Sequence, residues 1–208
     1  MTMRLFAFRV APYDNGTYVL ADERGDALVI DPAQGEREVL AQVRTSGLRV
    51  VELLNTHGHF DHVHDNAALK RATRARLAIH RLDAYRLGPE APAGGFPVPP
   101  CEPDDLIDEG PLGFIRDLEL LALHTPGHTE GSTCFHLPAA GIIFTGDVLF
   151  RGTMGRVDLP GGDAAAMERS LARLASLPPE TAVYPGHGAP TTIGAELPWL
   201  RGHRQSGS

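Results

Sequence analysis

The chain has 208 residues, of which 42% are hydrophobic and 22% charged. This length allows one large domain or two small ones, and this composition is ordinary for a globular protein with a buried core. The formal net charge of −7 argues against nucleic acid as a partner, because a phosphate-binding surface needs basic residues.

Cys101 and Cys134 are the two cysteines of the chain. They form neither a Cys-x-x-Cys pair nor a disulfide framework, so we expect inert thiols in a reducing compartment. The N-terminal segment is interrupted by Arg9 and lacks the apolar length of a signal peptide. The longest stretch without a charged residue, 131–146, is too short to cross a bilayer. We therefore expect a cytoplasmic protein that does not interact with membranes.

Strands and helices are expected to follow one another along the whole chain. Short apolar runs predict strands, whereas apolar residues spaced three or four apart predict helices. In the first part, strands are expected at 5–10, 17–20, 27–30, 50–54 and 77–80, with helices at 36–45 and 65–73. In the second part, strands are expected at 118–124, 133–137, 142–145 and 181–184, with helices at 163–176, where Asp163 is the candidate N-cap, and at 189–200.

Residues 88–103 are rich in proline and glycine and form the one candidate linker. Strand-like sequence and chemically reactive side chains lie on both sides of this stretch. A surface loop within one domain is therefore favoured over a domain boundary. Strands mixed with helices predict an α/β or α+β fold whose sheets are covered by helices.

The most specific feature is the sequence NTHGHFDH at residues 55–62, which has the pattern His-x-His-x-Asp-His. It follows a predicted strand, and a loop at this point cannot bury four polar side chains among apolar residues without partners. Imidazole and carboxylate are ligands that suit zinc, iron and similar divalent ions. The motif therefore predicts a metal site in preference to a solvated histidine-rich turn.

Three later segments share one design, in which an apolar strand ends in a glycine-containing turn with a polar residue. These polar residues are His128, Asp147 and His187. Each segment alone is typical of an ordinary turn. Together with the first motif they supply five histidines and two aspartates, which matches two metal ions that share one bridging carboxylate.

The order of these residues resembles the metallo-β-lactamase superfamily and, within it, the glyoxalase II-like hydrolases. The resemblance covers nearly the whole chain up to His187 and implies an α+β fold, a four-layered αβ/βα sandwich with the site at one edge. It implies two divalent metal ions as cofactors, with zinc as the first expectation and iron or manganese as alternatives. The implied ligands are His57, His59 and His128 for the first metal, Asp61, His62 and His187 for the second, and Asp147 as the bridge.

The implied reaction is cleavage of a small thioester of the S-lactoylglutathione type by a hydroxide held between the two metals. Asp61 and Asp147 are then the catalytic carboxylates. A thiolate leaves readily, which fits the absence of an evident general acid near the motifs. In the glyoxalase II-like proteins a basic residue at the position of Arg156 lies near the substrate, so Arg156 is the candidate substrate-binding residue. The alternative is an ion pair of Arg156 with Asp158 or Asp163 that orders the loop.

Two departures from glyoxalase II bear on the substrate. The chain ends shortly after His187, so we expect a single domain over residues 1–208 without the C-terminal helical domain that contacts glutathione in glyoxalase II. His64 stands where relatives commonly have a small residue, and we expect it to cap the following helix or to face solvent. The expected partner is a small-molecule substrate, and the oligomeric state is open.

Persulfide dioxygenases are the closest alternative, because they share the fold, the histidine motif and a similar Gly-Arg-x-Asp segment, which the sequence GRVD at residues 155–158 fits here. The resemblance implies that such an enzyme uses one iron, which His57, His128 and Asp147 would hold here. Lactonases and β-lactamases share the metal pair and are further alternatives. A nuclease is disfavoured by the net charge, and a non-enzymatic binding module is disfavoured because every ligand position is filled.

Overall fold

Two six-stranded sheets form the centre of the computed structural model, which describes residues 3–88, 98–116 and 118–203. The first sheet contains β1 (Arg4–Val10), β2 (Asn15–Ala21), β3 (Asp26–Ile30), β4 (Arg49–Asn55), β5 (Arg76–His80) and β6 (Asp105–Ile107), in this order. The second contains, from one edge to the other, β14 (Thr191–Thr192), β13 (Ala182–Pro185), β10 (Ile142–Gly146), β9 (Thr133–Leu137), β8 (Leu120–His124) and β7 (Gly110–Leu112). A small hairpin of β11 (Leu149–Phe150) and β12 (Thr153–Met154) lies beside the second sheet.

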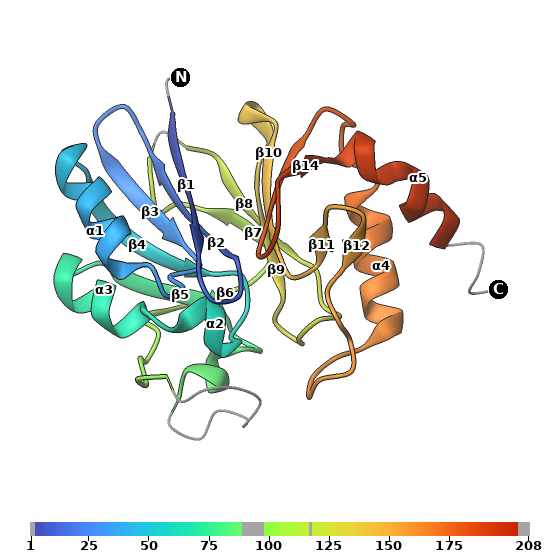
Figure 1. Cartoon of the computed structure of the whole chain (residues 1–208), viewed down its shortest axis with the longest axis horizontal. Coiled ribbons are helices and arrows are strands. Elements are labelled where there is room, and N and C mark those ends of the chain that lie inside the picture. The colour runs from blue at the N-terminus through green and yellow to red at the C-terminus, as the bar shows by residue number, and fades with distance from the viewer. Residues whose placement is uncertain (1–2, 89–97, 117, 204–208) are drawn as a thin grey trace.

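The helices cover the two outer faces of this pair of sheets, as Figure 1 shows. Against the first sheet lie α1 (Glu36–Thr45) and α3 (Asn66–Thr73), and against the second lie α4 (Ala164–Leu174) and α5 (Ile193–His203). The short helix α2 (Phe60–Val63) and two 3₁₀ turns, η1 (Ala84–Leu87) and η2 (Pro138–Ala140), lie in the connections. The predicted α+β sandwich of four layers is confirmed.

Three apolar clusters hold these layers together. Val39 of α1 and Leu53 of β4 belong to the cluster between the first sheet and its helices. Leu54 of β4 and Phe135 of β9 belong to the cluster between the two sheets, so consecutive residues of β4 serve two layers. Met167 of α4 lies in the third cluster. Full burial of a side chain of this size stabilises the fold by roughly 1.5–3 kcal/mol, so the four layers depend on each other.

The connections follow from the strand directions. Strands β3, β4 and β5 pair in parallel, and α1 and α3 provide the crossovers that parallel neighbours need. Helix α4 begins where the sequence predicts, because the side chain of Asp163 accepts a hydrogen bond from the backbone amide of Ala166. Every crossover returns the chain so that the carboxyl ends of β4 and β5 lie at the same edge of the first sheet.

Short elements account for most differences from the sequence-based expectation. Strands β6, β7, β11, β12 and β14 have two or three residues each, too few for a periodic pattern. Helix α5 begins at Ile193 and not at residue 189, because Thr191 and Thr192 pair with β13. Residues 89–97 of the expected 88–103 loop lie outside the described residues. Within the described ranges, no helix has the length and apolar character needed to span a bilayer.

Candidate metal centre

The chain folds so that all seven predicted ligands meet at one edge of the sandwich. His57 follows β4, His59 is the N-cap residue of α2, and Asp61 and His62 lie on α2 itself. The second sheet supplies the other three from the loops that follow β8, β10 and β13: His128, Asp147 and His187. The site therefore depends on the packing of one sheet against the other.

The first group consists of three imidazoles. One ring nitrogen from each of His57, His59 and His128 lies within 4.8 Å of the others. Nδ1 of His59 is 2.8 Å from Nε2 of His128. His57 and His128 are buried, whereas His59 is partly exposed. Three converging imidazoles of this kind suit zinc or iron.

The second group lies directly beside the first. Nε2 of His187 is 3.3 Å from Oδ2 of Asp61 and 3.2 Å from Nε2 of His62. The His62 side chain is fully buried, and those of Asp61 and His187 are 14% and 25% exposed. The second group is thus open to solvent on the side of His187.

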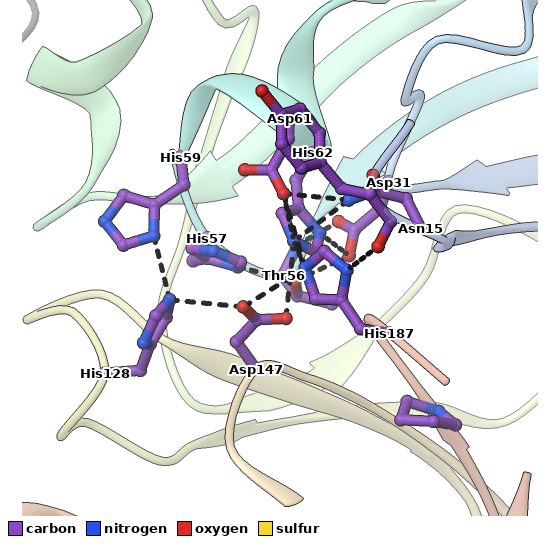
Figure 2. Close-up of polar contacts among 12 residues, drawn as sticks. Asn15, Asp31, Thr56, His57, His59, Asp61, His62, His128, Asp147 and His187 are labelled. Carbon is purple, nitrogen blue, oxygen red and sulfur yellow. Dashed lines mark hydrogen bonds and ion pairs between the residues drawn. The ribbon is translucent and has the colours of Figure 1, made fainter. Parts of the chain in front are cut away.

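Asp147 lies between the two groups, as Figure 2 shows. Its Oδ2 atom is 3.4 Å from Nε2 of His128 in the first group and 3.5 Å from Nε2 of His187 in the second. Its Oδ1 atom is 3.3 Å from Nε2 of His62. One carboxylate is therefore placed to contact cations in both groups.

Two buried atoms of the site have no hydrogen-bond partner among the described residues, and both point to a bound cation. They are Nε2 of His57 and Oδ1 of Asp147. A buried polar atom without a partner costs roughly 1–3 kcal/mol, so such atoms are rare unless a ligand satisfies them. An imidazole lone pair and a carboxylate oxygen are both metal donors, and the residues of the site fit a metal pair in number and type.

The electrostatics of the site favour this interpretation. Burial, together with the nearby imidazoles of His62 and His128, holds the pKa of His57 well below its usual value. Burial and the His128 ring lower the pKa of His59 to about 3. Both rings are thus neutral near pH 7, which is the form that binds a metal ion.

The carboxylates have the opposite effect on the second group. Burial lowers the pKa of His187, but hydrogen bonds to Asp147 and Asp61 outweigh it and raise this pKa to about 9. Burial raises the pKa of Asp147, but the nearby His62 and His187 lower it by more. This pKa therefore lies well below its usual value. The second group therefore contains ionised carboxylates, whose negative charge a bound cation would balance.

Three of the imidazoles are oriented by a contact of Nδ1, the ring nitrogen that faces away from the centre of the site. Nδ1 of His128 lies 2.7 Å from the carbonyl oxygen of Arg156, and Nδ1 of His187 lies 2.8 Å from that of Tyr13. Nδ1 of His57 is 3.1 Å from the Thr56 hydroxyl. Such contacts leave Nε2 free to face the centre and commonly tune metal affinity.

Sequence reasoning missed two residues that contact the ligands. The buried carboxylate of Asp31 lies 3.0 Å from Nδ1 of His62, and the buried amide of Asn15 donates to Oδ2 of Asp61 at 3.0 Å. Asp31 directly follows β3, and this strand-then-aspartate pattern, which also marks Asp147, could have revealed it. No local signal distinguishes Asn15, which reaches the site because its backbone pairs with His187.

Arg156 is tied to Asp158, the alternative that the sequence analysis left open. Its Nε and Nη2 atoms donate to the two carboxylate oxygens at 2.7 and 2.8 Å. Both side chains are exposed, at 60% and 67%. Asp163, the other candidate partner, caps α4. The backbone of Arg156 contacts His128, whereas its side chain is held on the surface.

His64 lies outside the two groups. Its Nδ1 atom is 2.7 Å from Oδ1 of Asp65, whose other oxygen accepts from the backbone amides of Gly35 and Glu36 at the start of α1. The side chain is about one-third exposed. His64 thus contacts a structural carboxylate and does not itself cap the following helix, because Asp65 is the N-cap residue of α3.

Comparisons with known proteins agree with the fold and the motif. The metallo-beta-lactamase superfamily profile matches residues 12–187, and the chain belongs to this superfamily. It is 38% identical over 193 residues to an uncharacterized protein of Aquifex aeolicus, with 90% of both chains covered. It is 35% identical to the hydroxyacylglutathione hydrolase of Maricaulis maris, where the match covers 84% of this chain and 62% of the relative. The chain thus matches less than two thirds of that hydrolase.

Three solved structures are similar over almost the whole chain. TTHA1623 in a di-iron-bound form has a TM-score of 0.83 at 39% identity and covers 92% of this chain and 96% of its own. The B3 metallo-beta-lactamase BLEG-1 has a TM-score of 0.88 at 29% identity, covering 95% and 99%. ETHE1 from Myxococcus xanthus has a TM-score of 0.78 at 28% identity, covering 97% and 85%. One fold thus accommodates proteins with different names, one of them in a di-iron-bound form.

Proposed function

We propose that this protein is a binuclear metallohydrolase that cleaves a small thioester of the hydroxyacylglutathione type. The observation that carries the proposal is the position of Asp147, whose two oxygens face both histidine groups within 3.5 Å. A single metal in the first group would leave the second group of Asp61, His62 and His187 without a role. Two ions explain all seven side chains.

In this proposal the first group holds one ion through its three imidazoles, and Asp61, His62 and His187 hold the other, with zinc as the first candidate. Bound ions of this kind lower the pKa of coordinated water and polarise the carbonyl of a substrate. The neutral rings of His57 and His59 offer lone pairs without competition from protons. Asp147 and Asp61 would balance part of the charge of such ions and help to hold them.

The choice of a thioester rests on relatives and on leaving-group chemistry. The Maricaulis maris relative is named hydroxyacylglutathione hydrolase. Beside the proposed ligands, the structure places the carboxylate of Asp31 against the second group, but this side chain is buried and already accepts a hydrogen bond from Thr56. A thiolate needs less help from a general acid than an amine does, so a thioester suits this site. We propose that the partner is a small molecule and that Arg156 meets a remote carboxylate after release from Asp158.

Two other functions are supported by particular relatives. The di-iron form of TTHA1623 shows that a similar protein holds iron, which keeps iron chemistry on a persulfide as the second candidate, with His57, His128 and Asp147 as the ligands. The likeness to the B3 metallo-beta-lactamase BLEG-1 supports hydrolysis of a lactam or lactone as the third. The second group of ligands favours the hydrolase over the mononuclear enzyme.

Hydrolysis of S-D-lactoylglutathione by zinc-loaded and iron-loaded protein tests the proposal. We expect turnover by the wild type and loss of most of it in Asp147→Asn, because both ions lose a shared charged ligand. Asp22→Asn is the matched control, since Asp22 is a buried carboxylate in the β2–β3 turn, away from the site. Absence of turnover in fully loaded wild type, together with oxygen consumption on glutathione persulfide, would replace the proposal with the dioxygenase.

A further inference from the structure

A buried carboxylate outside the ligand set joins the loops that carry the first group. Asp83 precedes the 3₁₀ turn η1 and is 0% exposed. It contacts none of the seven proposed ligands directly, and the sequence analysis gave it no role. Its contacts are made with the neighbours of those ligands along the chain.

The two oxygens of Asp83 hold loops that come from different sheets. Oδ2 accepts from the backbone amide of Gly58 and from the hydroxyl of Thr129, both at 2.8 Å. Oδ1 accepts from the backbone amide of Gly131 at 2.9 Å. Gly58 lies between His57 and His59 on the loop after β4, whereas Thr129 follows His128 on the loop after β8. One side chain therefore links the two sources of the three-histidine group.

Arg86, one turn further along, compensates the charge of Asp83. The Arg86 side chain is 4% exposed, and its Nε atom lies 3.4 Å from Oδ1 of Asp83. Its Nη2 atom donates to Oε2 of Glu130 at 2.7 Å and to the carbonyl of Pro160 at 2.8 Å. The pair thus also reaches the segment after Arg156, whose carbonyl orients His128.

The loops that carry Gly58 and Gly131 pack closely against the turn that carries Asp83 and Arg86. A Cβ atom added to Gly58 would lie 2.5 Å from Cβ of Arg86, and one added to Gly131 would lie 2.8 Å from Cβ of Asp83. Both loops therefore press their backbones directly against the turn. A change in the Asp83 contacts must be transmitted to the loops, because no side chain lies between to absorb it.

We propose that Asp83 is a positioning residue that sets the distance between His57 and His59 on one side and His128 on the other, and thereby the metal affinity of the first group. The inference rests on the proposed metal centre. The carboxylate accepts three hydrogen bonds from two loops at once. A carboxamide in its place presents N–H donors where one oxygen stood, so it cannot satisfy the same N–H and O–H groups. Within the described part of the chain, Asp83 makes no hydrogen bond to the second group, which we therefore expect to be independent of it.

The test is a titration of metal-free protein with Co²⁺, followed by NMR of the paramagnetically shifted imidazole N–H protons. Nδ1 protons of His57 and His128 report on the first group, and those of His62 and His187 report on the second, because each faces an oxygen partner. In Asp83→Asn we expect the affinity of the first group to fall by roughly 10–100-fold, as for other residues that support metal ligands. The affinity of the second group should stay unchanged.

Asp22→Asn serves as the matched control, because Asp22 is also a buried carboxylate that accepts from two backbone amides. It should leave both affinities unchanged. Equal losses at both groups in Asp83→Asn, or no loss at either, would overturn the inference. Thr129→Val is the milder variant if Asp83→Asn does not fold. It removes one hydrogen bond to Asp83, and we expect a selective loss of about three- to tenfold at the first group.

The two proposals fail in different ways. Wild-type protein that binds no Co²⁺ through His57 and His128 would contradict the metal centre itself. Wild-type protein that binds Co²⁺ normally, with Asp83→Asn and Thr129→Val both indistinguishable from it, would leave the metal centre in place and refute the role of Asp83.

Discussion

The buried carboxylate of Asp31 and the buried imidazole of His62 face each other, with 3.0 Å between Oδ2 and Nδ1. The other oxygen of Asp31 accepts from the backbone amide of Thr56 at 2.7 Å, and Oδ2 also accepts from the Thr56 hydroxyl. With its Nδ1 proton directed to Asp31, His62 presents Nε2 to Asp61, Asp147 and His187. The contact thus selects the tautomer of His62 that can bind a metal.

Asp31→Asn is therefore expected to weaken metal binding by the second group roughly 10–100-fold. The asparagine can keep only one acceptor oxygen, so either Thr56 or His62 meets an N–H group where it needs an oxygen. Competition with a chelator of known zinc affinity measures the change. Wild-type affinity in a folded Asp31→Asn variant would show that the contact has no influence on the metal.

The second prediction concerns stoichiometry. Zinc-replete protein should contain about two metal ions per chain, because both groups have ligands of suitable type at close distance. Elemental analysis after removal of free metal provides the count. Asp61→Ala should lower it to about one while His57, His59 and His128 retain their ion. A wild-type count that remains at one would contradict the binuclear centre.

The third prediction concerns Arg156→Ala. The side chain is exposed and bound to Asp158, whereas the contact with His128 is made by the backbone and survives the substitution. If the guanidinium binds a remote carboxylate of the substrate, the variant should raise KM by about tenfold or more and change kcat much less.

Asp158→Ala is the companion variant, because it releases the guanidinium without removing it. Its KM should be equal to or lower than that of the wild type. A loss confined to kcat in Arg156→Ala would instead place this residue in the chemical step.

The fourth prediction lies away from the site. Glu52 on β4 is 2% exposed, and its Oε1 atom has no hydrogen-bond partner among the described residues. Burial and the nearby Asp105 raise the pKa of Glu52 from 4.5 to about 8. Between these two values the folded protein keeps a proton that the unfolded chain releases. Stability therefore falls as the pH rises through this window, since the unfolded state binds fewer protons.

Glu52→Gln removes this titration and keeps the shape of the side chain. We expect the variant to be more stable than the wild type at about pH 8, by on the order of 1–3 kcal/mol, with a smaller difference at about pH 5. Urea denaturation at both pH values measures it. Glu119→Gln, at an exposed position, is the control. A stability difference that does not vary with pH would contradict the buried-acid explanation.

Local pattern was sufficient for the main elements of the fold. Helix α1 has the predicted bounds, and the strands that precede His57, Asp147 and His187 were all expected from short apolar runs. The two-residue strands were not, because a periodic signal needs more residues than they contain. The four-layered arrangement was predicted from the family resemblance, because periodicity alone does not show how the two sheets pack against each other.

The amino-acid sequence by itself determined the chemical character of the site: five histidines and two aspartates in a fixed order, in four segments that each follow an apolar strand. Only the tertiary structure decided which of them meet and what supports them. Asn15 reaches Asp61 across 46 residues, and Asp83 reaches Gly131 across 48. It also decided that Arg156 is paired with Asp158. Such contacts depend on how the two sheets pack, and this packing is set by the shape of the whole core. The local sequence around a single residue therefore does not predict them.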